Sequence, residues 1–109
     1  LSIATRDVRR LLDRYGSLNF TNWAWVVQGL GYMHDIRGHV VRAEALYREA
    51  LAIDPDHRDT LLDLAKLLAR QGRRQEAIAI CERAHALGGD AYWQHKFAQV
   101  EAMLGKGGE

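Results

Sequence analysis

The residues of this sequence that could bind a metal ion are its five histidines. His34 and His39 lie five positions apart across a predicted turn, and His57 lies beside several aspartates. A zinc site on a helix needs ligands at positions i and i+4, and neither group has that spacing. We therefore expect no metal and no other cofactor, and we interpret these histidines as polar residues of turns.

Candidate nucleophiles are equally sparse. Cys81 is the single cysteine of the chain, which excludes an intrachain disulfide. It falls on the inward face of a predicted helix, where a free cysteine usually acts as a small core residue. No Ser–His–Asp set, phosphate-binding loop or isolated carboxylate pair is present in the sequence. We therefore expect a protein that is not an enzyme.

Charge and hydropathy argue against two classes of partner. The formal net charge is +1 over 109 residues, which offers no electrostatic reason to expect nucleic acid. Arg70, Arg73 and Arg74 form a basic cluster, which we interpret as a solvated turn that also compensates a helix C-terminus. The alternative for this cluster is a contact to phosphate or to an acidic peptide. No apolar run approaches the ~18 residues of a membrane-spanning helix, so we expect no membrane insertion.

Two features of the sequence bear on its origin and compartment. No secretion signal is visible, which favours the cytoplasm over secretion. The chain begins at Leu1 without methionine and stops after a glycine-rich tail, so we expect a piece of a longer protein. Arginine outnumbers lysine 12 to 3, which hints at a bacterial source.

Helical periodicity dominates the elements that must position these residues. Thr5 is a predicted cap and Gly16 a predicted stop for the first helix, with Thr21 or Asn22 capping the second and Asp56 the fourth. Pro55 is the predicted stop of the third helix. The predicted stops of the second, fourth, fifth and sixth helices are glycines, namely Gly38, Gly72, Gly88 and Gly105. The pattern predicts six helices joined by short antiparallel turns, at about 5–15, 23–36, 40–53, 57–70, 74–87 and 91–104.

A self-match at a spacing of 34 residues organises this pattern. When residues 24–57 are aligned with residues 58–91, seven positions coincide without a gap. Most of them are small or apolar, and we expect most to lie in the core. A fixed period of this length is typical of stacked helical repeats. The matching pairs are Leu30/Leu64, Gly38/Gly72, Ala43/Ala77, Ala45/Ala79, Ala50/Ala84, Ala52/Ala86 and Asp56/Asp90.

Each unit resembles a tetratricopeptide repeat. The first unit carries Val27-x2-Leu30-Gly31-x2-His34, then Ala43-x3-Tyr47-x2-Ala50, then Pro55. The second carries Leu61-x2-Leu64-Ala65-x2-Leu68, then Ala77-x3-Cys81-x2-Ala84, then Gly89. His34 and Cys81 depart from the aromatic preference of their positions, and Gly89 replaces the expected proline. The small residues at positions 31 and 65 are expected to let paired helices approach closely.

The resemblance implies an all-α, right-handed superhelix that forms a single domain of about six antiparallel helices. The two repeats occupy residues 24–57 and 58–91. Residues 1–22 would form an N-terminal capping helix and loop, or the second helix of a degenerate repeat. Residues 92–105 would form a C-terminal capping helix, because their apolar positions do not follow the repeat.

The same resemblance implies a protein-interaction module that binds a peptide or partner helix in a concave groove. The residues expected to line it combine aromatic and polar side chains, as interfaces do, and are Trp25, Gln28, Tyr32, Leu62, Lys66, Arg70, Trp93 and Lys96. The alternative for Trp25 and Trp93 is packing against the terminal helices. A carboxylate clamp is disfavoured, because Asp59 and Asp63 would repel a carboxylate.

Two other functions stay open at this point. The chain could be an oligomerisation or scaffold arm whose capping helices pack on a second copy. It could also be the accessory region of a larger bacterial enzyme whose catalytic part is absent from this sequence.

Overall fold

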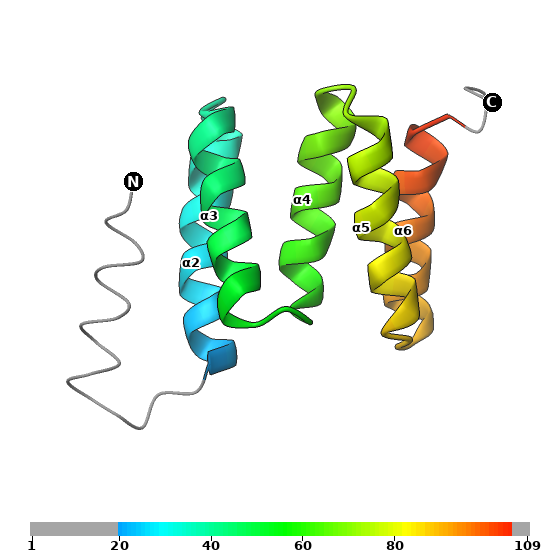
Figure 1. Ribbon diagram of the computed structural model, residues 1–109, viewed down its shortest axis with the longest axis horizontal. Coiled ribbons are helices and arrows are strands. Elements are labelled where there is room, and N and C mark those ends of the chain that lie inside the picture. Colours follow the sequence, from blue (N-terminus) through cyan, green and yellow to red (C-terminus); the bar gives the residue numbers. More distant parts are fainter. Residues whose placement is uncertain (1–19, 106–109) are drawn as a thin grey trace. The chain divides into compact units, whose positions relative to one another are not determined.

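The computed structural model describes residues 20–105, and this part of the chain is helical without strands. Figure 1 shows its five helices: α2 (Phe20–Ile36), α3 (Val40–Ile53), α4 (Arg58–Arg70), α5 (Arg74–Ala86) and α6 (Ala91–Met103). The expected all-α class is thereby confirmed. The first predicted helix, at about 5–15, lies outside the described residues. The chain divides into two compact units after His57, and each is described by itself.

The helix boundaries match the expectation except at two N-termini and at the C-termini of α5 and α6, each of which lies one residue before the predicted end. α3 spans the predicted range, whereas α2 begins at Phe20, three residues before the predicted start. Thr21 and Asn22 therefore lie inside the helix, and the prediction that either caps it was wrong. Polar residues of this kind are tolerated in a first turn, and no glycine or proline stops the helix there.

The start of α4 differs from the prediction by one residue. The helix begins at Arg58, so Asp56 lies too far upstream to be its cap, and that prediction was also wrong. Asp54 instead accepts a hydrogen bond at 3.2 Å from the backbone N–H of Asp56 through its Oδ1 atom, which closes an Asx-type turn around the proline. At α6, Asp90 is a true cap, because its carboxylate accepts the backbone N–H of Trp93 at 3.3 Å.

The 34-residue period is reproduced in the backbone of the two equivalent turns. Gly38 and Gly72 have φ angles of 81° and 75°, a region that glycine occupies without steric cost. The residues that follow them, His39 and Arg73, have φ/ψ of −84°/71° and −87°/69°. Each donates its N–H to the carbonyl five residues earlier, at 2.8 and 3.0 Å. The sequence repeat is therefore also a repeat of turn geometry.

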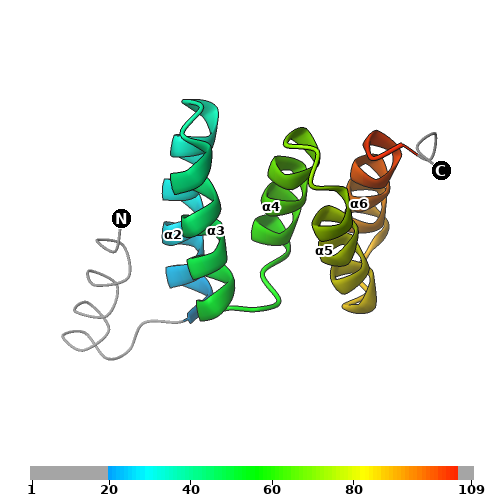
Figure 2. The same cartoon turned by 45° about the horizontal axis from the view of Figure 1, so that its top comes forward.

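In the first unit, α2 and α3 lie side by side, as Figures 1 and 2 both show. Buried side chains of the two helices form one cluster between them, made of Trp23, Val27, Leu46 and Ala50, with Ile53 packed against it. The two helices are in close contact at Gly31. A Cβ atom there would lie 2.8 Å from two ring carbons of Tyr47. Gly31 thus acts as the small contact residue that the repeat pattern predicts.

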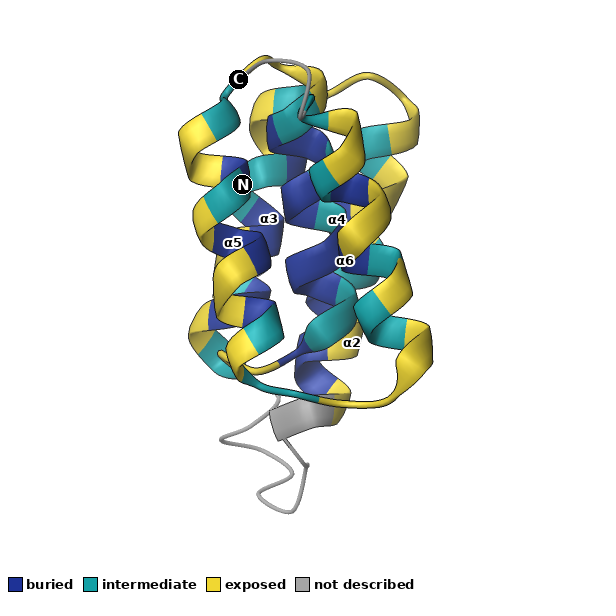
Figure 3. Ribbon diagram, turned by 90° about the vertical axis from the view of Figure 1, so that its right-hand side faces the viewer, coloured by how far each residue is buried: buried dark blue, intermediate teal, exposed yellow. Residues whose placement is uncertain are grey.

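In the second unit, α4 packs against α5 and α6, and α5 also packs against α6. Each ribbon is buried on one side and exposed on the other, as the blue and yellow bands of Figure 3 show. The buried set is mostly leucine on α4 and is small, aliphatic or aromatic on the other two helices, namely Thr60, Leu61, Leu62, Leu64, Ala65, Leu67, Leu68, Ala77, Ile80, Cys81, Ala84, Phe97 and Val100. Helix pairs with one apolar face each are the expected unit of a helical repeat.

Candidate partner-binding surface

Trp25 and Tyr32 lie on the outward face of α2, where each side chain is half-exposed. They are seven residues apart, which places them two helical turns from each other on the same face. Gln28 lies between them and is partly buried. The ring of Trp25 contacts the buried ring of His57 edge to face, with centroids 4.6 Å apart. This contact within the first unit orients the indole while half of it stays accessible.

The equivalent positions of α4 are polar. Asp59 and Lys66 lie 34 residues after Trp25 and Tyr32, and both are partly exposed. Arg70 is exposed in the last turn of the same helix. Leu62 differs from these residues, because it is only 7% exposed and belongs to the buried set. Its side chain contributes to packing rather than to an accessible surface.

On α6, the two predicted contact residues are partly engaged within their own unit. Trp93 is partly buried between Tyr92 and Phe97, with ring centroids 5.1 and 6.3 Å away. The ammonium of Lys96 lies 5.5 Å from the ring centroid of Tyr92, within range of a cation–π interaction. Both aromatic contacts of Trp93 are therefore to residues of its own helix, and its role as a contact residue stays a prediction.

A second exposed strip of α2 was not predicted from the sequence. Val26, Leu30 and Met33 are exposed, although Leu64, the equivalent of Leu30 in the second repeat, is buried. Leu30 is thus an exception to the expectation that most coincident positions lie in the core. The feature of the sequence that could have revealed this strip is the absence of any charged residue between positions 20 and 34. A helix that is apolar on every side has no contrast from which its buried face can be recognised.

The histidines divide into two kinds of environment. At the α2–α3 turn, the Nδ1 atoms of His34 and His39 lie 3.1 Å apart. Partial desolvation and the positive charges of His39, Arg42 and Arg37 lower the pKa of His34. Within residues 20–105, no three or more His, Cys, Asp or Glu side chains are grouped so that they could hold a metal ion.

His85 instead joins two helices. Its Nδ1 lies 2.8 Å from Oε1 of Gln94, and its Nε2 lies 3.1 Å from Oε1 of Glu101, so α5 is linked to α6 twice. The hydrogen bonds to Glu101 and Gln94 raise the pKa of His85.

Cys81 on α5 is fully buried. Its burial, followed by the charges of Glu101 and Glu82, raises the pKa of its thiol to about 12. Such a thiol is not a nucleophile at neutral pH.

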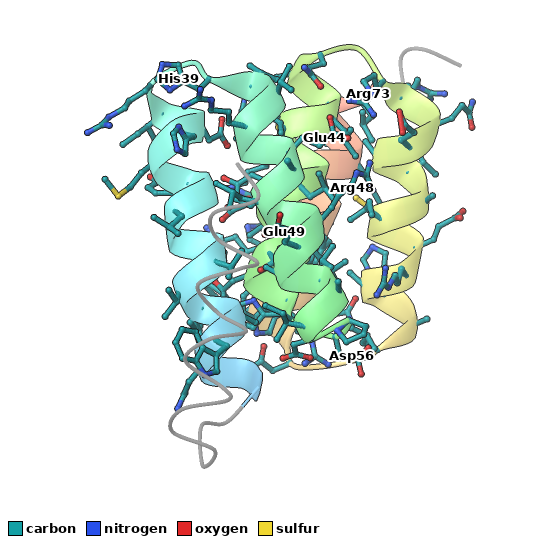
Figure 4. The ribbon with its side chains drawn as sticks, turned by 60° about the vertical axis from the view of Figure 1, so that its left-hand side comes forward. His39, Glu44, Arg48, Glu49, Asp56 and Arg73 are labelled. Carbon is teal, nitrogen blue, oxygen red and sulfur yellow. The ribbon has the colours of Figure 1, made fainter. Side chains whose placement is uncertain are left out.

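A hollow of about 410 Å³ is lined, among the described residues, by His39, Val40, Val41 and Arg42. Figure 4 places His39 at one end of the first unit and Asp56 at the other. The hollow therefore lies at the turn between α2 and α3, away from Trp25 near the beginning of α2.

No helix within residues 20–105 has the length and apolar content needed to cross a bilayer.

Comparison with known proteins identifies similar sequences. A family model described as tetratricopeptide repeat matches residues 37–100. A protein of Pseudomonas putida named probable biofilm formation methyltransferase WspC is 36% identical over 85 residues, which cover 78% of this chain and 20% of that protein. The protein of the same name from Pseudomonas aeruginosa is 38% identical over 61 residues, covering 56% of this chain and 14% of that protein.

A third relative has a different name. The cellulose synthase operon protein C of Xanthomonas axonopodis pv. citri is 51% identical over 49 residues, which cover 45% of this chain and 3% of that protein. The chain thus spans a fifth or less of the length of these curated relatives. No solved structure matches the chain.

Proposed function

Because the chain belongs to the tetratricopeptide repeat family, whose repeats generally mediate protein–protein interaction, we propose that it is a protein-interaction module. The observation that supports this most directly is the pair Trp25 and Tyr32. Two large aromatic side chains stay half-exposed on one face of a helix, although burial would stabilise the fold. Aromatic residues of this kind are enriched among the residues that dominate binding energy.

The finer proposal is that the partner is a peptide or helix that binds along a concave groove. Its support is the 34-residue register. Trp25 and Tyr32 occupy the same positions of the repeat as Asp59 and Lys66, whose side chains are also partly exposed. Both units thus offer the same helix positions to a partner, with apolar anchors from one and charged groups from the other. Arg70 extends this set toward the end of α4.

Affinity capture from the native lysate, followed by titration of the captured partner, tests this proposal. Trp25→Ala and Tyr32→Ala should each weaken binding by roughly tenfold or more, as loss of a hot-spot aromatic does. Lys66→Ala should act in the same direction with a smaller effect. Val41→Ala is a matched control, because Val41 is exposed on α3 and lies outside the proposed set. If the aromatic variants bind as tightly as the control, the surface is wrongly assigned.

One alternative is favoured by a specific observation. Two relatives are named as methyltransferases, and this chain corresponds to a fifth or less of each. The chain would then be the accessory repeat region of a larger enzyme and would present that enzyme to a partner. The full open reading frame decides this, because a catalytic domain encoded beside these repeats would establish it. Sedimentation over a range of concentrations tests the remaining alternative of an oligomerisation arm.

A further inference from the structure

The strip formed by Val26, Leu30 and Met33 is distinct from the face that carries Trp25 and Tyr32. Successive members are four and three residues apart, so they are neighbours along one side of α2. Their exposed fractions are 51%, 41% and 47%. No charged residue interrupts the helix between positions 20 and 34. A strip of this kind is normally covered in the folded protein.

The internal repeat shows what happens to the same positions in the other unit. Thr60, Leu64 and Leu67 lie 34 residues after Val26, Leu30 and Met33, and their exposed fractions are 0%, 0% and 1%. The corresponding side of α4 is thus completely covered. Because the two helices occupy the same place in the repeat, the strip on α2 has the character of a helix-packing face.

Residues 5–15 have the sequence properties of an occupant for that face. Val8, Leu11, Leu12 and Tyr15 follow the i, i+3, i+4, i+7 spacing of one apolar helix face. Arg10 and Arg14 fall on the opposite side. Such a helix would therefore present an uncharged face to the uncharged strip and keep its charges toward water.

The short connection supports the same assignment. Four residues, 16–19, separate this segment from the first residue of α2. They can span at most about 14 Å, which is little more than the 8–10 Å between the axes of packed helices. Helices joined by so short a loop are usually antiparallel neighbours. The connection between α5 and α6, residues 87–90, is also four residues long, and these two helices pack against each other.

We propose that residues 5–15 form an amphipathic helix that covers Val26, Leu30 and Met33 of α2. The segment would close the exposed end of the repeat and would leave Trp25 and Tyr32 available to a partner. This inference concerns a different side of α2 from the proposed binding surface, and each can fail without the other.

Thiol labelling of the whole chain tests the proposal. The background is Cys81→Ala, and the probe is Met33→Cys. If residues 5–15 cover the strip, this thiol should react at least roughly tenfold more slowly than Val41→Cys, an exposed reference on α3, because labelling then requires local opening. Adding Leu11→Glu and Leu12→Glu should restore fast labelling. Adding Arg10→Glu and Arg14→Glu, on the opposite side of the same segment, should not.

Several results would overturn the proposal. Labelling of Met33→Cys as fast as Val41→Cys, before any change to the segment, would show that nothing covers the strip. Protection that rises with protein concentration, together with a dimer in sedimentation, would assign the strip to a second copy. Protection that persists in the Leu11→Glu/Leu12→Glu protein would assign the cover to another part of the chain.

Discussion

Arg58, the first residue of α4, donates from Nη2 to the backbone carbonyl of Leu87 at 3.1 Å, so the start of one helix supports the end of the next. The same kind of contact, from an arginine side chain to a backbone carbonyl, is made by the arginine sixteen residues later. Arg74, the first residue of α5, donates from Nε to the carbonyl of Leu104 at 3.1 Å, just beyond α6. The terminal carbonyls of a helix lack partners inside it and carry partial negative charge. Each arginine therefore satisfies a helix terminus thirty or so residues away.

These contacts predict a stability loss on truncating the guanidinium. Arg58→Met and Arg74→Met keep an apolar stem but remove the donors, and each should lower the free energy of unfolding by about 1–2 kcal/mol. Arg48→Met is the control, because Arg48 pairs with Glu44 on the surface of α3, where such pairs contribute about 0.5 kcal/mol or less. Urea denaturation of the three variants gives the comparison. Equal effects for all three would mean that the carbonyl contacts contribute nothing specific.

The contact between Gly31 and Tyr47 predicts a second effect. Gly31→Ala should destabilise the protein by about 1–3 kcal/mol, because the new Cβ would lie 2.8 Å from the Tyr47 ring. The ring is fully buried and its hydroxyl donates to Asp35 at 2.9 Å, so it has little room to move. Thermal or urea unfolding measures the loss.

Gly29 supplies a matched control on the same helix. A Cβ there meets nothing within 4 Å, so Gly29→Ala should stabilise the protein by about 0.5–1 kcal/mol through helix propensity alone. If both alanine variants raise stability, α2 and α3 are not held as closely as the Gly31–Tyr47 contact requires.

The double link made by His85 predicts a dependence on pH. Its pKa is raised in the folded state by Glu101 and Gln94, above the ordinary value of 6.5. The extra stability is therefore fully present below the pKa of the unfolded chain and is lost as pH rises through the raised value. Both side chains of the His85–Glu101 pair are about one-third exposed, so the gain should be about 0.5 kcal/mol or less.

The measurement is the difference in unfolding free energy between wild type and Glu101→Gln, at about pH 5.5 and about pH 8.5. The difference should be larger at the lower pH, where the imidazolium can donate to both acceptors. A difference that is the same at both values, or larger at the higher one, would contradict the assignment of His85 as the titrating group.

The burial of Cys81 predicts that its thiol is unreactive in the native protein. Its pKa is raised to about 12, so the reactive thiolate is nearly absent at neutral pH, and the side chain is fully buried. A disulfide reagent at about pH 8 should label the native protein far more slowly than the denatured protein. Comparable rates in the two states would mean that α5 and α6 open freely around this residue.

Much of the helical organisation could be predicted because it depends on local chemistry. Gly38, Gly72 and Pro55 interrupt the apolar periodicity, and glycine with positive φ is needed at the two equivalent turns. These signals place α3 correctly and bring the ends of α5 and α6 within one residue. Helix N-termini were predicted less well, because Thr21, Asn22 and Asp56 are all good caps on composition alone. Which of several polar residues stops a helix depends on the backbone around it.

The exposure of the candidate surface residues was predictable only where the two repeats could be compared. Trp25, Tyr32 and Lys66 fall outside the core positions of the repeat, and the structure describes all three as accessible to some degree. Leu62 was assigned to the surface by the same comparison but is buried. The period identifies equivalent positions, whereas the exposure of each side chain depends on the neighbours that surround it.

The sequence by itself determined the repeat length, the helical class and the small residues at which helices meet, because these follow from local conformation and from spacing along one chain. Only the tertiary structure decided that Leu30 is exposed while Leu64 is buried, and that Arg58 and Arg74 reach carbonyls some thirty residues away. The burial of a side chain and its long-range hydrogen bonds depend on its neighbours in the folded protein, and these neighbours come from distant parts of the chain.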